Sequence, residues 1–200
     1  ICISKSTQNK LREIIRKFFL FKKYKIQYGY QSITKLNESS NEDFKESIAN
    51  QRSYRWMAFN DSQPHKNPKI ILGISKYSEL LDINSILICK NVNTKRALNS
   101  KLKVSIKPNN QTLRNIYLNT YYLIYPSKCE GFGLPILEAL SFDVIPLIYP
   151  SKVNIEIYGK NYKFFFNNLN SLKDLIKKIP SKEDIIYISE VRNKIIRKVR

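Results

Sequence analysis

Residues 120–148 decide the fold, and they read TYYLIYPSKCEGFGLPILEALSFDVIPLI. The run Thr120–Tyr125 is dominated by aromatic and branched residues, which is typical of a strand that is buried on both faces. A loop with two glycines follows, then a predicted helix over Leu134–Leu140 and a second predicted strand over Val144–Ile148. A strand, a helix and another strand in succession predict a parallel sheet covered by helices on both faces.

The same alternation extends outward over residues 52–200. Further strands and a short helix are predicted over Tyr54–Phe59, Ser85–Cys89, Leu102–Ile106, Gln111–Leu118 (the helix) and Tyr162–Phe166.

Sequence patterns also predict where three helices begin. After His65, Asn67 is expected to cap a helix that starts at Pro68 and buries Ile71, Ile74, Leu80 and Leu81. Two capping boxes, Ser171 with Asp174 and Ser181 with Asp184, predict the last two helices.

The amino-terminal part differs in composition, because it includes a polar stretch with few large apolar residues. A strand over Ile1–Ser4, a helix over Thr7–Phe19 and a strand over Lys25–Gly29 precede a polar stretch at 31–51. We therefore expect three parts: residues 1–30 as the end of a preceding domain, 31–51 as a linker or excursion, and 52–200 as the main domain. Because the chain opens at Ile1 rather than Met, we expect it to be a piece of a longer protein.

The charge admits several interpretations. The 200 residues carry 35 Lys and Arg against 16 Asp and Glu, a formal net charge of +19. With 42% hydrophobic residues the chain is not a disordered basic tail. Codon bias toward Lys, Ile and Asn and contact with an anionic membrane surface explain the charge about equally well. Nucleic-acid binding ranks lower, because none of its motifs is present.

Other function classes are excluded by what the sequence lacks. No apolar run reaches the roughly 18 residues of a membrane-spanning helix. We also expect no secretory signal, because Lys5 and Lys10 precede any apolar stretch. The three cysteines, Cys2, Cys89 and Cys129, are too scattered for a disulfide framework or a zinc site, which favours a reducing compartment.

The loop before Leu134 carries the chemistry. Gly131 and Gly133 let backbone amides approach a ligand closely, and the helix start behind them suits a phosphate. Glu130 in the loop and Glu138 one turn into the helix can face the same mouth, where carboxylates accept hydrogen bonds from sugar hydroxyls.

The block from Glu130 to Ala139, EGFGLPILEA, resembles the signature of the family 4 (group 1) glycosyltransferases of the GT-B fold. Weaker resemblances to the same family follow its order along the chain, at residues 1–29, 63–67, 113–126 and 155–166. The resemblance implies an α/β fold: a Rossmann-like parallel sheet forming one half of a GT-B protein, plus a fragment of the second Rossmann-like domain.

The resemblance also implies a function. It implies a retaining transferase that moves a sugar from a nucleotide diphosphate sugar to a glycan or lipid-linked acceptor, with neither a metal nor a cofactor. Glu130 would be the catalytic residue beside the transferred sugar, Glu138 would bind the donor ribose, and Lys66 would neutralise the diphosphate. The remaining donor-binding residues would be Gly131, Phe132, Gly133 and Leu134. His65 is expected to be structural, and residues 1–200 alone to transfer sugar poorly.

Two departures from the family pattern keep an alternative open. The loop Phe59–Gln63 lacks the Gly and Arg that the family commonly has there, and residues 141–146 replace small residues with Ser-Phe-Asp-Val-Ile-Pro. A catalytically degenerate nucleotide-sugar-binding or scaffold subunit is therefore the second hypothesis, and a basic nucleic-acid-binding protein the third. For the first hypothesis we expect a cytoplasmic location, with peripheral membrane contact as a further expectation.

Overall fold

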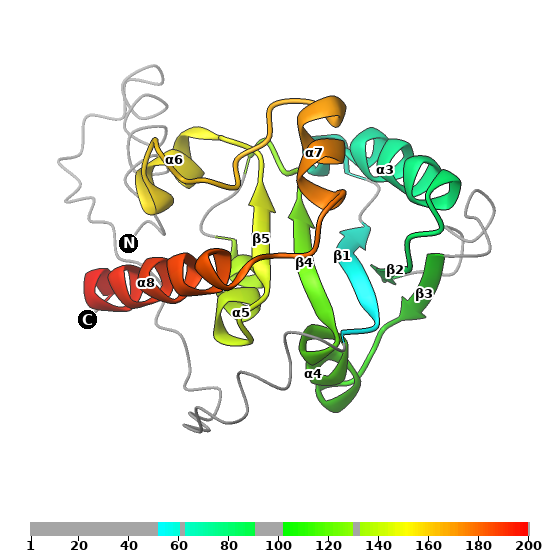
Figure 1. Cartoon of the computed structure of the whole chain (residues 1–200), viewed down its shortest axis with the longest axis horizontal. Coiled ribbons are helices and arrows are strands. Elements are labelled where there is room, and N and C mark those ends of the chain that lie inside the picture. Colours follow the sequence, from blue (N-terminus) through cyan, green and yellow to red (C-terminus); the bar gives the residue numbers. More distant parts are fainter. Residues whose placement is uncertain (1–51, 61–62, 91–101, 130–132, 200) are drawn as a thin grey trace, which may run out of the picture.

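The computed structural model describes residues 52–60, 63–90, 102–129 and 133–199. Within these ranges, parallel strands form one sheet in the order β3-β2-β1-β4-β5 (Figure 1). The strands are β1 (Tyr54–Asn60), β2 (Ser85–Cys89), β3 (Leu102–Ile106), β4 (Thr120–Tyr125) and β5 (Ile145–Ile148). The predicted Rossmann-like parallel sheet is confirmed. The elements predicted over residues 1–51 lie outside the described residues.

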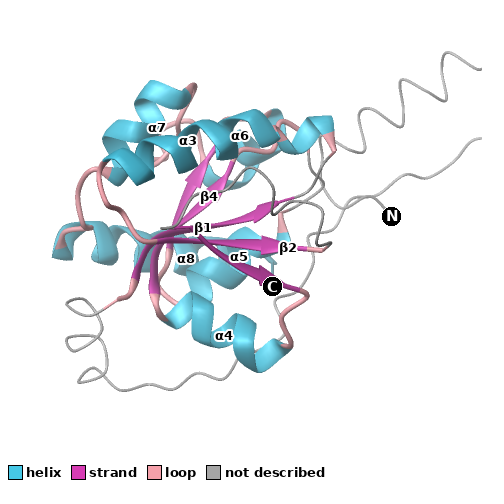
Figure 2. Ribbon diagram, turned by 90° about the vertical axis from the view of Figure 1, so that its right-hand side faces the viewer, coloured by secondary structure: helices cyan, strands magenta, loops and turns pink. Residues whose placement is uncertain are grey.

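Helices cover both faces of this sheet. Figure 2 shows α3 and α7 on one face and α4 and α5 on the other. The helical elements are η1 (Pro64–Lys66, a 3-10 turn), α3 (Pro68–Leu80), α4 (Asn110–Leu118), α5 (Leu134–Ser141), α6 (Lys152–Tyr158), α7 (Leu169–Ile176) and α8 (Lys182–Val199). α8 packs against α5 and α6.

The hydrophobic core lies on both sides of β1 and β4. Trp56 and Met57 of β1 and Leu123 of β4 are completely buried. The indole N–H of Trp56 donates a 2.8 Å hydrogen bond to the Ser78 hydroxyl of α3, so this buried polar group is satisfied. The interior strands β2 and β4 are buried along their whole lengths, as expected in a parallel sheet. β5 is equally buried although it lies at the edge of the sheet.

The strand predicted over Tyr162–Phe166 is wrong. Only Phe165 makes an isolated parallel bridge, to Ile148 at the end of β5. The segment is held by its rings instead: Tyr162 packs edge-on against Phe164 and Phe165, and its hydroxyl donates to the Pro146 carbonyl at 2.7 Å. Aromatic packing therefore takes the place of a strand ladder here.

The start of α3 is partly as predicted. Pro68 occupies the first turn, but the side chain of Asn67 makes no capping hydrogen bond. Asn67 has a left-handed backbone (φ 53°), and its N–H closes the η1 turn on the Pro64 carbonyl. Asparagine tolerates this conformation better than most residues do.

The inner face of α3 differs from the prediction at its far end. Ile71 and Ile74 are buried as expected, whereas Leu80 is 83% exposed and Leu81 49% exposed. The positions that continue the buried stripe are Ser75 and Ser78, which follow Ile71 at helical spacing. Leu80 lies off this stripe, and Leu81 is the C-cap residue that follows the last turn of α3.

The caps of α6 and α7 were missed or misplaced. α7 begins three residues before the predicted start, because Asn168 is the capping residue and its carboxamide accepts from the Ser171 amide at 3.0 Å. Ser171 returns the bond by accepting from the Asn168 amide at 3.2 Å. The box predicted for Ser171 and Asp174 is therefore wrong. No helix was predicted over α6, which Ser151 caps through its hydroxyl.

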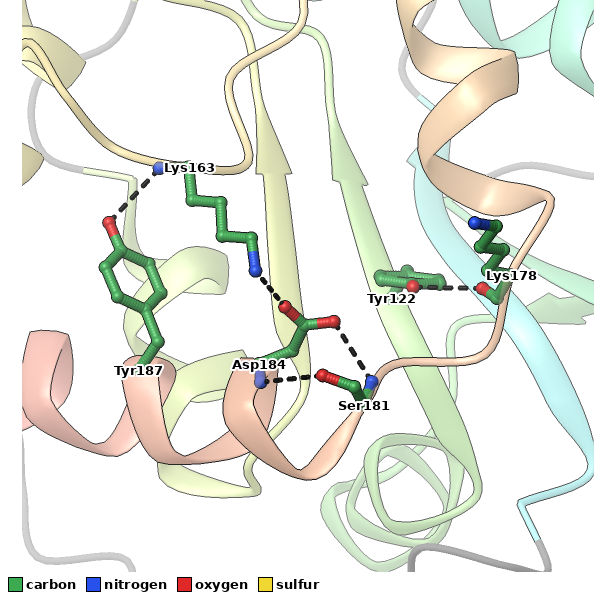
Figure 3. Close-up of polar contacts among 6 residues, drawn as sticks. All are labelled: Tyr122, Lys163, Lys178, Ser181, Asp184 and Tyr187. Atoms are coloured by element: carbon green, nitrogen blue, oxygen red, sulfur yellow. Dashed lines mark hydrogen bonds and ion pairs between the residues drawn. The ribbon is translucent and has the colours of Figure 1, made fainter.

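The capping box of α8 is confirmed (Figure 3). The Ser181 amide donates to Asp184 at 3.0 Å, and the Asp184 amide donates to the Ser181 hydroxyl at 3.3 Å. Asp184 also pairs with the Lys163 ammonium, and the Lys163 amide donates to the Tyr187 hydroxyl at 3.1 Å. These contacts fasten the first turns of α8 to the aromatic segment after α6.

The turn between α5 and β5 explains one departure from the family pattern. Asp143 has a left-handed backbone with φ 51°, a conformation that favours glycine. Its carboxylate pairs with the Arg192 guanidinium of α8 at 2.8 Å. Arg52, which precedes β1, donates to the carbonyls of Thr120 and Phe142. Aspartate adopts this backbone conformation less easily than glycine does, but its carboxylate binds Arg192 of α8.

We predict that Asp184→Asn lowers the free energy of unfolding by about 1 kcal/mol at neutral pH, because it weakens the cap and removes the ion pair. Burial raises the pKa of Asp184, but the hydrogen bonds from Lys163 and the Ser181 amide outweigh burial and leave that pKa below its ordinary value. A lowered folded-state pKa stabilises the protein above the unfolded pKa of about 4, and this contribution is lost as the pH falls through the folded-state value.

Denaturant unfolding at a series of pH values checks this prediction. The difference between wild type and variant should shrink below about pH 4 and close as the pH falls through the lowered folded-state pKa of Asp184. Asp174→Asn is the matched control, because that carboxylate pairs with Lys177 on an exposed surface and should change stability by less than about 0.5 kcal/mol. A difference that stays constant down to the lowest pH would contradict the assigned role of the Asp184 charge.

Candidate functional site

A pocket of about 320 Å³ opens at the carboxyl ends of the strands. Its position is the point where the chain changes direction in the sheet: β2 lies on one side of β1, and β4 lies on the other. In open parallel sheets this switch point is where ligands bind. The residues that line the pocket include Lys66, Lys90, Lys107, Tyr125, Ser127 and Pro135.

The charged residues among the described lining of this pocket are positive. Lys66 comes from η1 after β1, Lys90 directly follows β2, and Lys107 directly follows β3. Among the described residues that line the pocket there is no aspartate or glutamate. The Lys66 ammonium lies 6.0 Å from the centre of the Tyr125 ring, a cation–π distance. The pocket is therefore suited to an anionic ligand.

Two loops at the pocket are fastened to each other through one carbonyl. The Lys128 amide donates to the His65 carbonyl at 2.9 Å, and the buried Ser127 hydroxyl donates to the same oxygen at 3.3 Å. The loop that carries Lys66 is thereby tied to the loop that follows β4. His65 contributes its backbone to this contact, in line with the structural role expected of it.

The first turn of α5 depends on a glycine. Gly133 has φ +77°, and a Cβ placed on it would lie 3.0 Å from the Ile136 side chain. Of the donor-binding residues predicted in this segment, Gly133 is buried and Leu134 is 47% exposed, and Pro135 is the residue of this turn that lines the pocket. Glu130, Gly131 and Phe132 lie outside the described residues.

Glu138 lies in α5, one turn in from its start, and does not line the pocket itself. Its Oε2 accepts a 2.9 Å hydrogen bond from the hydroxyl of Tyr117 in α4. Burial, followed by the charge of Glu138, raises the pKa of Tyr117 far above its ordinary value, so this phenol stays protonated and donates. The structure thus places Lys66 in the lining of the pocket and Glu138 outside that lining, on α5 about one turn after Pro135.

The two arginines before the pocket loop do not contribute to the pocket. Arg52 donates to the carbonyl of Thr120, the first residue of β4, and to that of Phe142 in the turn before β5. Arg55 donates to the carbonyls of Ile176 and Lys177 at 3.0 Å. Both side chains thus lie at the amino ends of the strands, opposite the pocket.

Sequence reasoning missed Lys90 as a pocket residue and Tyr117 as the partner of Glu138. Lys90 could have been found, because it directly follows a predicted strand and the carboxyl ends of parallel strands meet at one edge. Tyr117 is the tyrosine of the family resemblance over residues 113–126, but that resemblance does not indicate its partner, which is 21 residues away on another helix.

The described residues contain neither a cluster of metal-binding side chains nor a membrane-spanning helix. No group of three or more His, Cys, Asp or Glu side chains there could hold a metal ion. Among the described helices, none combines the length and the apolar character needed to cross a bilayer.

Solved structures share this fold, and some of them contain UDP or UDP-glucose. A mutant of S. aureus TarM in complex with fondaparinux, alpha-GlcNAc-glycerol and UDP superposes with a TM-score of 0.69 and 14% identity, covering 100% of this chain and 40% of the other. Anabaena HepE with UDP-glucose gives 0.67 and 13%, covering 99% and 58%. The GtfA/B complex gives 0.65 and 12%, covering 99% and 42%.

These likenesses establish the fold as a Rossmann-like α/β unit of the GT-B kind. The chain spans about two-fifths to three-fifths of the length of the structures it matches. No curated protein matches the sequence. The model of the family "Glycosyl transferases group 1" matches residues 89–200, more than half of the chain. The chain therefore belongs to the group 1 glycosyl transferases.

Proposed function

We propose that this chain is the donor-binding half of a glycosyltransferase that takes its sugar from a nucleotide diphosphate sugar. The observation that carries the proposal is the pocket at the switch point of the sheet, lined by Lys66, Lys90 and Lys107 and by no acidic residue among those described. A diphosphate carries the negative charge that such a pocket attracts, and its departure as a leaving group is helped by positive charge placed where the negative charge develops.

The roles of individual residues are proposed from the family resemblance, and the position of Lys66 in the pocket supports its role. Lys66 binds the diphosphate, because it lies in the pocket between the ends of β1 and β4. Glu138 binds the ribose of the donor, and the backbone at Gly133 and Leu134 contacts the sugar and phosphate. Glu130, with Gly131 and Phe132, completes the site beside the transferred sugar; these three roles rest on the family resemblance alone.

Lys90 and Lys107 take the place of the arginine that the family pattern has in the loop over residues 59–63. The family pattern has a second cation in that loop, where this chain has none. Both lysines line the same pocket as Lys66 and reach it from the ends of β2 and β3. We propose that they supply the second positive charge, so that the loss of the loop arginine leaves donor binding intact.

The remaining features of the enzyme are proposals from the resemblance. Transfer proceeds with retention of configuration, and the acceptor, a glycan or a lipid-linked sugar, contacts mainly a second domain. Residues 1–30 are the end of that domain, 31–51 join the two, and 52–200 form the donor domain. A cytoplasmic location with peripheral membrane contact fits the basic character of the chain.

The second candidate is a degenerate subunit that binds a nucleotide sugar without transferring it. The altered loop over residues 59–63 favours it. Donor hydrolysis by a longer protein containing this chain separates the two candidates. Slow release of free sugar that Glu130→Gln abolishes supports the enzyme, and no release above background supports the binding subunit.

We predict that UDP or GDP binds this chain and that Lys66→Gln raises its Kd about tenfold, because one charge-assisted contact to the diphosphate is lost. Glu138→Ala should also raise the Kd by a similar factor. Isothermal titration of each nucleotide into the purified chain measures both effects. The wild-type affinity should fall as salt rises, because lysine–phosphate contacts at an open pocket are screened.

Lys76→Gln is the matched control for this titration. Lys76 is exposed on α3 and lies outside the pocket, yet its substitution changes the net charge by the same amount. If Lys76→Gln weakens binding as much as Lys66→Gln does, attraction is nonspecific and the proposed donor site is wrong. Absence of any nucleotide binding by the wild type would contradict the proposed function outright.

We also predict that donor binding is independent of divalent metal. Three ammonium groups around the pocket supply the positive charge that a magnesium ion supplies to nucleotides elsewhere. The Kd of the diphosphate nucleotide should be the same within about twofold in EDTA and in excess Mg²⁺. Binding that requires Mg²⁺ would show that the lysines do not neutralise the diphosphate.

A further inference from the structure

The hydrogen bond between Tyr117 and Glu138 joins two helices beside the pocket. The Tyr117 hydroxyl lies 2.9 Å from Glu138 Oε2 and 3.4 Å from the carbonyl of Pro135. Pro135 lines the pocket and Glu138 lies one turn further along the same helix. One phenol therefore contacts both the first turn of α5 and the carboxylate that follows it.

The ring that presents this hydroxyl is itself held firmly. Tyr117 is 1% exposed, and it stacks on Phe142 with ring centroids 5.3 Å apart and planes 9° from parallel. The Arg114 guanidinium lies 5.6 Å from the centre of the Phe142 ring. Such stacked and cation–π contacts restrict the ring to one orientation. The large residue at 142, a departure from the family pattern, is thus part of the support for Tyr117.

The hydroxyl of Tyr117 acts as the donor to Glu138. Burial raises the pKa of Tyr117, and the charge of Glu138 and its hydrogen bond raise that pKa further. A protonated phenol has one hydrogen to donate, and the carboxylate takes it at the shorter of the two distances. The bond fixes one oxygen of Glu138 and with it the torsion angles of a side chain that would otherwise sample several rotamers.

The second carboxylate oxygen keeps its capacity to accept. Among the described residues, Glu138 Oε1 has no hydrogen-bond partner, although the side chain is half-buried. A carboxylate with one oxygen anchored and the other available is organised in advance for a ligand hydroxyl, which lowers the ordering cost of binding.

We propose that Tyr117 is a positioning residue that orients Glu138 toward the ribose hydroxyls of the donor nucleotide and so sets the discrimination between ribonucleotides and deoxyribonucleotides. This inference rests on the proposed function, because it needs a nucleotide at the pocket. It adds a residue on a different helix, and a specificity, that the motif around Glu138 does not contain. Tyr117 does not touch the nucleotide; it acts through Glu138.

The test compares UDP with 2′-deoxy-UDP and 3′-deoxy-UDP by isothermal titration. For the wild type, at least one deoxynucleotide should bind about tenfold more weakly than UDP, because a charge-assisted hydrogen bond is lost. Tyr117→Phe should raise the Kd of UDP about fivefold and leave the deoxynucleotides nearly unchanged, so that the discrimination shrinks toward twofold. Loss of packing alone would weaken all three nucleotides by one factor.

Tyr122→Phe is the matched control. It also removes one tyrosine hydroxyl, whose 3.0 Å hydrogen bond to the Lys178 carbonyl lies away from the pocket (Figure 3). This variant should keep the wild-type discrimination. A second check is Tyr117→Phe in a Glu138→Ala background, where the tyrosine substitution should have no further effect on the Kd of UDP because the residue it acts through is gone.

The outcomes separate this inference from the proposed function. If the wild type binds neither UDP nor GDP, both fail. If it binds UDP and Tyr117→Phe leaves the discrimination unchanged, or binds UDP more tightly, only the positioning role is overturned. Should Tyr117→Phe fail to fold, Phe142→Leu, which loosens the ring and keeps the hydroxyl, should reduce the discrimination about twofold. Unchanged discrimination in that variant overturns the inference as well.

Discussion

The structure depends on the pairing of β1 with two partners, β2 on one side and β4 on the other. All these strands run in the same direction, so their carboxyl ends meet at one edge of the sheet. The chain leaves β1 toward β2 and β3, and later crosses back to add β4 and β5. The loops after β1 and β4 therefore diverge, and the space between them is where the pocket opens. No single motif makes this pocket; the strand order does.

The pocket is kept in shape by contacts that the pairing makes possible. Because β1 and β4 are neighbours, the loops that follow them can share the His65 carbonyl, which accepts from Lys128 and Ser127. On the α5 side, the Gly133 conformation sets the start of the helix, and the Tyr117 hydroxyl ties the helix to α4. At the opposite edge, Arg52 and the Arg192–Asp143 pair hold the turn after α5. The two ends of α5 are thus fixed by unrelated interactions.

This arrangement changes the meaning of the +19 charge. Taken as a total, the charge is explained about equally well by codon bias and by contact with an anionic membrane, and less well by nucleic-acid binding. Three of the lysines, however, come from the segments that follow three different strands, and they line one pocket with no carboxylate among its described lining residues. Local convergence at a site of defined geometry is a stronger argument for an anionic ligand than any sum over the surface.

Local signals were enough for most elements. The strands β1 to β4 and the start of α3 at Pro68 were predicted because burial pattern and proline geometry are properties of short segments. The cap at Ser181 was predicted for the same reason. The cap at Asn168 was missed because Asn168 and Ser171, three residues apart, both fit the pattern of a capping residue. Residues 162–166 read as a strand by composition, yet their rings found partners in other segments.

The sequence by itself determined the fold class, the family resemblance and the residues Lys66, Gly133 and Glu138 as candidates for the site. These are read from spacing and residue type, which short stretches contain in full. Only the tertiary structure decided that Lys90 and Lys107 join Lys66, that Arg52 and Arg55 lie at the other edge of the sheet, and that Tyr117 holds Glu138. The physical reason is that each of these facts is a contact between segments far apart in the chain, and strand order and helix packing bring such segments together.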